Sequence, residues 1–295
     1  MRWAFLVAPL ACTPILAAQD ASAPLEVRRL TEIRDRRLRE SSGVAVSRAH
    51  RGVIWTLSDS GNGPYLYATD STGRVLATFE VRAARNADWE ALTRGPCPDG
   101  PWRMRTCLYI GDTGDNDEAR PHVVIYAVPE PDPDGGGRPE DTTATVTARS
   151  LRVRYPDRPR DAEGLAALPD GALALITKGR SGPILRFMIP PGAWQAEEYE
   201  LASPDTLPIQ PQFLAGRWVS DAAVDSAGRR AVVRTYTELY FFDVGPDWTL
   251  AGPPCRMGLI EPQGEGVAFR EDGSVLLTSE RARGTPGAYT VVRCP

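Results

Sequence analysis

Apolar and polar residues alternate in short runs along most of the chain, and turn residues separate the runs. Examples are YLYATD from Tyr65, HVVIYAVPE from His122 and ELYFFDV from Glu238, all rich in β-branched or aromatic residues. Turns such as Pro-Asp-Gly and Glu-Asp-Gly lie between such runs, and no amphipathic helical period of useful length occurs. This pattern predicts antiparallel strands joined by hairpin turns, and therefore an all-β protein.

One phrase recurs along this pattern. GVIWTLSD from Gly52, GALALITK from Gly171, GRRAVVRT from Gly228 and GSVLLTSE from Gly273 each run from a turn glycine to a polar residue seven positions later. A short, mostly apolar segment precedes each turn. Repeats of roughly 45 to 70 residues with about four antiparallel strands each are typical of β-propeller blades. A β-sandwich would not produce the repeat.

The repeat predicts five blades, which open at Ser42, Glu90, Glu163, Asp221 and Glu265. A sixth blade is the alternative if the long stretch 180–217 hides another copy. The last blade is one strand short, and the run LEVRRLTEI from Leu25 is available to complete it. This closure would leave no exposed sheet edge in the ring. We expect a single propeller domain over residues 24–295.

The first residues resemble a secretory signal peptide. MRWAFLVAPLACTPILAAQD has one arginine, an uncharged apolar stretch through Ala18, and small residues before the expected cleavage site. Residues 1–18 are therefore expected to be removed on export to the periplasm or the extracellular space. A lipid anchor through Cys12 is the minor alternative. No second apolar span follows, so the mature chain is expected to lack a transmembrane segment.

Four cysteines remain after residue 18. An even number in an exported chain favours disulfides, and Cys97 and Cys107 flank a gap of hairpin size. Cys255 would then pair with Cys294. A zinc site is disfavoured, because the chain has no CxxC spacing and only two histidines. The net charge of −4 disfavours nucleic acid as a partner, and we expect a monomer.

Strand geometry predicts that acidic residues gather at one end of the propeller axis. The first strand of each blade begins where the second strand ends, so both termini lie on the same face. The acids expected there as metal ligands are Glu90, Glu163, Asp221, Glu265, Asp59 and Asp112. Converging carboxylates need a cation, a raised pKa or a positive side chain beside them. Oxygen ligands outside the cell favour calcium. The alternative is that some of these acids only cap turns or bind backbone N–H groups of a neighbouring blade.

Common hydrolase and nucleotide motifs are absent from the sequence. It has no Gly-x-Ser-x-Gly elbow, no P-loop and no dinucleotide fingerprint. His50 and His122 offer little to a Ser-His-Asp triad. Any catalysis would therefore depend on carboxylates and a bound metal, with Lys178 or Arg234 contacting an anionic substrate. No catalytic residue can be assigned from the sequence.

Three phrases carry a resemblance to known families: SGVAVSRAHRGVIWTLSDSG, DAEGLAALPDGALALITKG and PQGEGVAFREDGSVLLTSE. They resemble blade phrases of exported bacterial propellers of the esterase-like phytase and SdiA-regulated families. The resemblance covers most of the mature chain and implies a β-propeller with acids facing a calcium-associated pocket. The matching positions are Glu163, Glu265, Asp59 and Glu280. The chain departs from the pattern at Ser42, at Lys178 and in the insertion after Arg94.

Two function classes follow. The first is an exported propeller whose acidic face binds calcium and hydrolyses a phosphoester or carboxylic ester. The second is a non-catalytic propeller that binds a small-molecule or envelope ligand on the same face. The fold itself does not decide between them.

Overall fold

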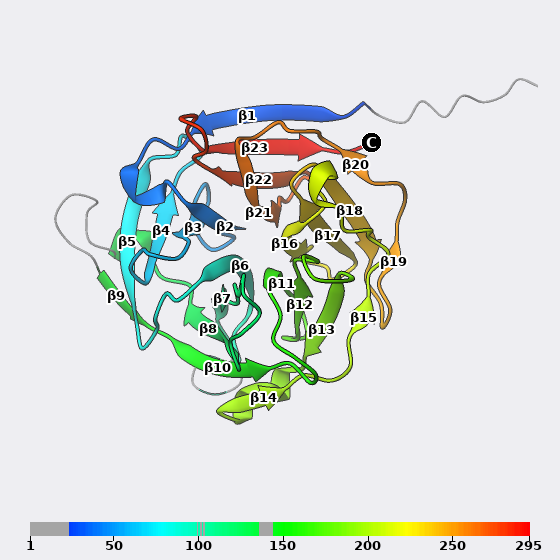
Figure 1. The fold of residues 1–295 in the computed structure, drawn as a ribbon. Helices are drawn as coiled ribbons and strands as arrows, with labels where there is room; N and C mark the ends of the chain where they lie inside the picture. The colour runs from blue at the N-terminus through cyan, green and yellow to red at the C-terminus, as the bar shows by residue number, and fades with distance from the viewer. Residues whose placement is uncertain (1–23, 99, 101, 103, 136–143) are drawn as a thin grey trace, which may run out of the picture.

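Five mainly antiparallel sheets surround a central axis, as the computed structural model shows (Figure 1). The structure describes residues 24–98, 100, 102, 104–135 and 144–295. The predicted signal segment and Cys12 lie outside the described residues. The five-bladed β-propeller predicted from the repeat is confirmed, and its inner strands begin where the sequence places the blade openings.

The blades follow the chain in order, with the innermost strand first in each. Blade 1 contains β2 (Ser41–Val46), β3 (Ile54–Ser58), β4 (Tyr65–Thr69), β5 (Val75–Arg82) and β9 (Ala144–Thr147). Blade 2 contains β6 (Trp89–Pro96), β7 (Thr106–Asp112), β8 (Val123–Pro129), β10 (Arg149–Arg154) and β14 (Glu198–Glu200). Blade 3 contains β11 (Ala162–Ala167), β12 (Leu173–Thr177), β13 (Leu185–Ile189) and β15 (Asp205–Thr206). Blade 4 contains β16 (Val219–Val224), β17 (Arg230–Thr235), β18 (Glu238–Asp243), β19 (Thr249–Leu250) and β20 (Cys255–Arg256).

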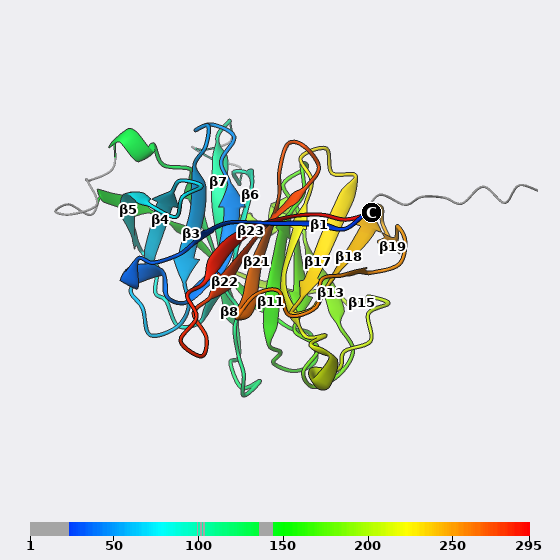
Figure 2. The ribbon, with the colours of Figure 1, turned by 90° about the horizontal axis from the view of Figure 1, so that it is seen from above.

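Blade 5 closes the ring through the N-terminal strand, as predicted. It contains β21 (Gln263–Phe269), β22 (Val275–Glu280), β23 (Ala288–Arg293) and, as its outermost strand, β1 (Glu26–Glu32). β1 pairs antiparallel with β23 along most of its length, and Figure 2 shows the two strands side by side. Pairing the first strand with the last gives β23 a partner on its outer edge, which an open blade would expose.

The stretch 180–217 contains no sixth blade, so that alternative is wrong. It holds β13, a 3-10 helix η3 (Pro191–Gln195), the short strands β14 and β15, and η4 (Phe213–Ala215). Two further 3-10 helices are η1 (Arg36–Leu38) and η2 (Pro133–Gly135). The run ATVTARSLRV serves two blades: β9 adds to β5 in parallel, while β10 pairs with β8. Added edge strands therefore widen blades 1 and 2 without adding a repeat.

The hydrophobic core is divided among the blade interfaces. Each of five buried clusters in the described chain joins two adjacent blades. Consecutive side chains of a strand point to opposite faces of the sheet, so they contact the two different neighbouring blades. Leu165 of β11 packs with blade 2, whereas the next residue, Ala166, packs with blade 4. The strands of a blade are thus buried on both faces, which explains their nearly continuous apolar runs.

Each inner strand has a register shift close to the residue that opens its blade. Shifts occur across Ser42, Glu90, Glu163, Ser220, and the pair 265–266. A bulge re-aims the side chain of the extra residue. In blades 1, 3 and 5 a glycine follows the opening residue and allows close packing of the inner strands. A Cβ at Gly43 would come within 2.6 Å of the Leu92 nitrogen, and one at Gly266 within 2.7 Å of the Val44 nitrogen. In these three blades the opening residue has a re-aimed side chain, and the glycine after it makes a tight contact with a neighbouring inner strand.

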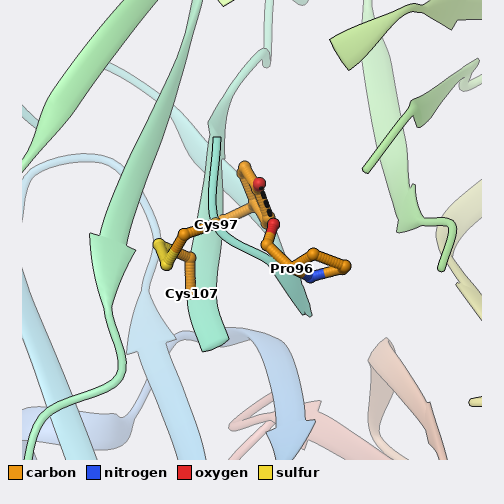
Figure 3. Close-up of a disulfide and its surroundings, with 4 residues drawn as sticks. Pro96, Cys97 and Cys107 are labelled. Atoms are coloured by element: carbon orange, nitrogen blue, oxygen red, sulfur yellow. Dashed lines mark hydrogen bonds between the residues drawn. A yellow bond between two sulfur atoms is a disulfide. The ribbon is translucent and has the colours of Figure 1, made fainter. Parts of the chain in front are cut away.

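Both predicted disulfides are present. Cys97–Cys107 links the strand pair β6 and β7 within blade 2 (Figure 3). Cys255–Cys294 joins β20 of blade 4 to the residue after β23 of blade 5. The first disulfide closes a hairpin, and the second holds two blades together.

Candidate functional site

The acidic end of the propeller axis is formed by two sets of positions. The bulge of an inner strand places Glu90, Glu163 and Glu265 there. The position directly after the second strand adds Asp59, and the last residue of β22 adds Glu280. Asp88 precedes β6 and completes the group. We call Asp59, Asp88, Glu90, Glu163, Glu265 and Glu280 the acidic end.

Three of these acids form a cluster with the dimensions of a metal site. Asp59, Asp88 and Glu90 each offer a carboxylate oxygen within 4.8 Å of the others. Oxygens that bind one calcium ion at about 2.4 Å can be at most about 4.8 Å apart. Glu90 is buried, whereas Asp59 and Asp88 are half-buried. The cluster can therefore hold a divalent cation and leave other coordination positions to water or a ligand.

Gly114 keeps space beside this cluster. It lies in the loop after β7, and its backbone nitrogen donates a 3.2 Å hydrogen bond to the Asp88 carbonyl. A Cβ at this position would lie 2.4 Å from Asp88 Oδ2 and 2.8 Å from Glu90 Oε1. The two carboxylates can take their observed positions because residue 114 has no side chain.

Lys178 is the cation within this end of the axis. Its ammonium group donates a hydrogen bond to Glu163 Oε1 and lies 3.7 Å from Asp161 Oδ2. Glu163 is buried, and its carboxylate is balanced by this lysine. In the described chain no lysine lies within ion-pair distance of Asp59, Asp88 or Glu90, the acids that blades 1 and 2 contribute. Glu163 therefore has a positive partner, whereas these three acids have none of this kind.

On the other side of the axis, a glutamine bridges two acids. Gln263 Nε2 donates hydrogen bonds to Glu265 Oε1 at 3.0 Å and to Glu280 Oε2 at 2.8 Å. One amide group thus holds two carboxyl groups that would repel each other if both were charged.

Burial and mutual repulsion act on the pKa of the acids other than Asp59 at this end. Burial is the main cause in each, and it raises the pKa of Asp88 to about 6, with Asp59 adding to the shift. The pKa of Glu265 rises to about 7, although Gln263 opposes the shift. Burial also acts to raise the pKa of Glu163, and the ammonium group of Lys178 opposes that shift. The pKa of Glu280 rises to about 9, with a contribution from Glu265. A bound cation would relieve this repulsion.

Asp221 does not join the acidic end, and its alignment with the other opening acids was wrong by one residue. The register shift of β16 falls at Ser220, so Asp221 occupies the position that glycine or alanine takes in the other blades. Its Oδ2 accepts a 2.7 Å hydrogen bond from the Val267 nitrogen, and its Oδ1 accepts one from its neighbour Ala222. Asp221 therefore accepts a hydrogen bond from the backbone of a neighbouring blade, which was the alternative to metal binding.

Arg234 and Asp112 are likewise occupied by contacts within the protein. The guanidinium of Arg234 is 1% exposed and donates to the carbonyls of Gly266 and Thr278 and to Glu261. It joins blades 4 and 5 and does not face solvent, so the predicted contact with an anionic substrate has no support. Asp112 accepts hydrogen bonds from the Asp88 nitrogen at 2.9 Å and from Arg120 at 3.0 Å. Arg120 balances its charge.

Sequence reasoning missed the contribution of Tyr236. Burial raises the pKa of its phenol, and Glu265 adds to the effect. Tyr236 directly follows β17, as Lys178 follows β12 and Asp59 follows β3. The seven-step phrase ends at Thr235 in this blade and so stops one residue short of Tyr236. The usable signal is the position directly after the second strand, which reaches the acidic end in these three blades. Asp88 did carry a signal, because it lies two positions before Glu90 and residues two apart in a strand share a side. Gln263 carries no comparable signal, since it is the first residue of β21.

No family model matches the chain, and no curated protein matches it. Solved structures do. An aldose sugar dehydrogenase from Streptomyces coelicolor in its PQQ-bound form aligns with a TM-score of 0.52 at 12% identity, over 92% of this chain and 99% of that one. A gluconolactonase from Xanthomonas campestris aligns with a TM-score of 0.50 at 15% identity, over 100% and 99% of the two chains. At these identities the likeness shows the fold alone. It supports a β-propeller family and does not single out the esterase-like phytase or SdiA-regulated type.

Proposed function

We propose that the acidic end binds a divalent cation, calcium by its chemistry, through Asp59, Asp88 and Glu90. The observation that carries this proposal is the approach of three carboxylate oxygens to within 4.8 Å. Calcium prefers such oxygen ligands and tolerates varied geometry. The half-buried positions of Asp59 and Asp88 give the ion access to solvent.

We further propose that the bound cation serves the hydrolysis of a phosphoester or carboxylic ester. A cation at this position supplies Lewis-acid activation of an ester oxygen or of water. Glu163, Glu265 and Tyr236 lie around the three ligands and provide carboxyl and phenol groups for proton transfer. The gluconolactonase among the structural neighbours is a propeller that acts on an ester-type bond, which is consistent with this chemistry. The substrate itself remains to be found by screening.

The two disulfides and the N-terminal segment support export as part of this proposal. Disulfides persist in oxidising compartments, and both lie within the propeller. In the described residues, no helix has the length and the apolar character needed to cross a membrane. We propose that residues 1–18 direct export to the periplasm or beyond, which N-terminal sequencing of the mature protein would test.

The deciding experiment combines metal binding with a substrate screen. Purified protein is titrated with calcium by calorimetry and assayed against model phosphoesters and carboxylic esters, with and without chelator. We expect one calcium site that Glu90→Gln abolishes, and hydrolysis that the chelator stops. Asp134→Asn, at an exposed loop acid, is the matched control and should behave as the parent. Calcium binding without hydrolysis would favour the non-catalytic ligand-binding propeller, and absence of calcium binding would overturn the metal site.

A further inference from the structure

The opposite end of the propeller axis contains a cavity of about 730 Å³. It lies where the inner strands end, so its lining includes Val46 of β2, Pro96 of β6, Ala167 of β11, Val224 of β16 and Phe269 of β21. The acidic end lies at the other termini of the same strands. The cavity is thus separate from the proposed metal site, and its volume falls in the range of small-molecule pockets.

Arginines dominate the charge of this cavity. Its lining contains six of them and only two acids, Asp225 and Glu271. The arginines are Arg48, Arg94, Arg105, Arg229, Arg230 and Arg270. Asp225 is already engaged in its turn, where its Oδ1 accepts a 2.8 Å hydrogen bond from the Arg229 nitrogen. The protein as a whole carries a net charge of −4, so this concentration of positive charge is a local feature.

Most of these arginines lack a partner. Arg230 lies 3.7 Å from Asp243, and Arg270 lies 3.3 Å from Asp272. Within the described part of the chain, the side chains of four others, Arg48, Arg94, Arg105 and Arg229, make no hydrogen bond or ion pair. Unpaired guanidinium groups that share one cavity repel each other and favour the binding of an anion.

Arg94 is the central case because its side chain is half-buried. Burial lowers the pKa of its guanidinium, Glu130 opposes that shift, and the positive charge of Arg48 adds to it. Glu130 Oε1 already accepts hydrogen bonds from Ser47 and from Trp55 Nε1, the latter at 2.9 Å. A partly desolvated cation without an ion pair is costly, and an anionic ligand would compensate for that cost.

Much of the rest of the lining is apolar. Val46, Leu168, Phe241 and Phe269 face the cavity, and the two phenyl rings lie 6.3 Å apart. Both rings are only half-buried, which leaves aromatic surface available to a ligand. A pocket that combines apolar walls with a few charged groups selects a ligand with the same two features.

We propose that this arginine-lined cavity binds an organic anion, with an apolar body against Phe241 and Phe269 and a carboxylate, phosphate or sulfonate group at Arg94 and Arg48. Guanidinium groups bind all three anions through paired N–H donors. The ligand is either a free small molecule or the headgroup region of an anionic lipid, since both present this chemistry.

The test compares two fluorescent probes that share a ring system. 8-Anilinonaphthalene-1-sulfonate carries an anionic group, and N-phenyl-1-naphthylamine lacks it. We expect saturable binding of one sulfonated probe per chain, and at least a fivefold weaker affinity in Arg94→Gln. Arg48→Gln should also weaken it, and because Arg48 is exposed this variant is expected to fold as the parent does. Affinity for the neutral probe should not change in either variant. Arg82→Gln, on the exposed end of β5, is the matched control.

Displacement of the sulfonated probe then identifies the source of the ligand. Displacement by octyl phosphate but not by phosphatidylglycerol vesicles supports a free small molecule, and displacement by the vesicles supports a lipid. The proposal is overturned if the sulfonated probe does not bind saturably, or if both arginine variants bind it as the parent does. It is also overturned if neither competitor displaces it. Calcium binding is not part of this readout, so failure here leaves the proposed metal site untouched.

Discussion

Lys178 and Glu163 form a buried ion pair at the acidic end of the propeller axis. The lysine follows β12, and the glutamate lies in the bulge of β11, so both belong to blade 3. The pair neutralises one carboxylate among six. In the part of the chain that the structure describes, no positive side chain lies within ion-pair distance of the Asp59, Asp88 and Glu90 cluster. The remaining negative charge marks the side of the axis where a cation is expected.

The pair should be important for the stability of the cation-free protein. Lys178→Met would leave Glu163 buried without its partner, and breaking a buried pair in this way costs about 3–5 kcal/mol. We expect this loss in urea unfolding with chelator present. The double variant with Glu163→Gln should recover much of the loss, because it removes the unpaired charge as well. Equal stability of the single variant and the parent would show that Glu163 is already protonated.

Gly114→Ala should weaken the metal site without removing any ligand. The added methyl group would meet Asp88 and Glu90, whose flexible carboxylates can shift to make room. We expect calcium affinity to fall about tenfold, or about 1.4 kcal/mol, with the melting temperature in chelator nearly unchanged. Gly192→Ala, where no atom lies within 4 Å of the added Cβ, is the control. Unchanged affinity in Gly114→Ala would place the ion elsewhere.

Stability in chelator should depend on pH in a defined direction. The pKa of Glu280 rises from 4.5 to about 9 on folding, and that of Glu265 from 4.5 to about 7. Below pH 4.5 these two groups are protonated in both states, and their contribution to stability is fully present. As pH rises, the unfolded chain ionises first, so stability is lost progressively until about pH 9. Thermal melts across this pH range should show the melting temperature falling as pH rises. Glu280→Gln should make this fall smaller, and saturating calcium should also make it smaller. A flat profile for the parent in chelator would contradict the raised pKa values.

The two disulfides should contribute unequally to stability. Cys255–Cys294 closes 39 residues and joins two blades, whereas Cys97–Cys107 closes 10 residues within one hairpin. Replacing a disulfide by alanines costs about 2–5 kcal/mol, and loop entropy makes the longer closure worth about 1 kcal/mol more. Guanidinium unfolding of the two double-alanine variants measures this difference. A larger loss from the hairpin disulfide would show that local strain relief or packing outweighs chain entropy.

Sequence alone determined the architecture. The even number of cysteines and the short gap between Cys97 and Cys107 predicted both disulfides. The turn glycines and the alternating runs recur because each blade packs against its neighbours in the same way, so they predicted five blades and left the run near Leu25 to close the ring. These features depend on local strand geometry and on the repeat length, both of which are visible along the chain.

Only the tertiary structure decided which polar residues meet. A one-residue difference in bulge position sends Asp221 to the backbone of blade 5, while Glu163 reaches the axis. Arg234 of blade 4 donates its hydrogen bonds to backbone carbonyls of blade 5, and the pattern of its own strand does not predict these contacts. Register and side-chain direction depend on contacts between blades, and those contacts form only when the ring closes. The gathering of arginines at the opposite end has the same origin, because its members come from the ends of different blades and share no motif.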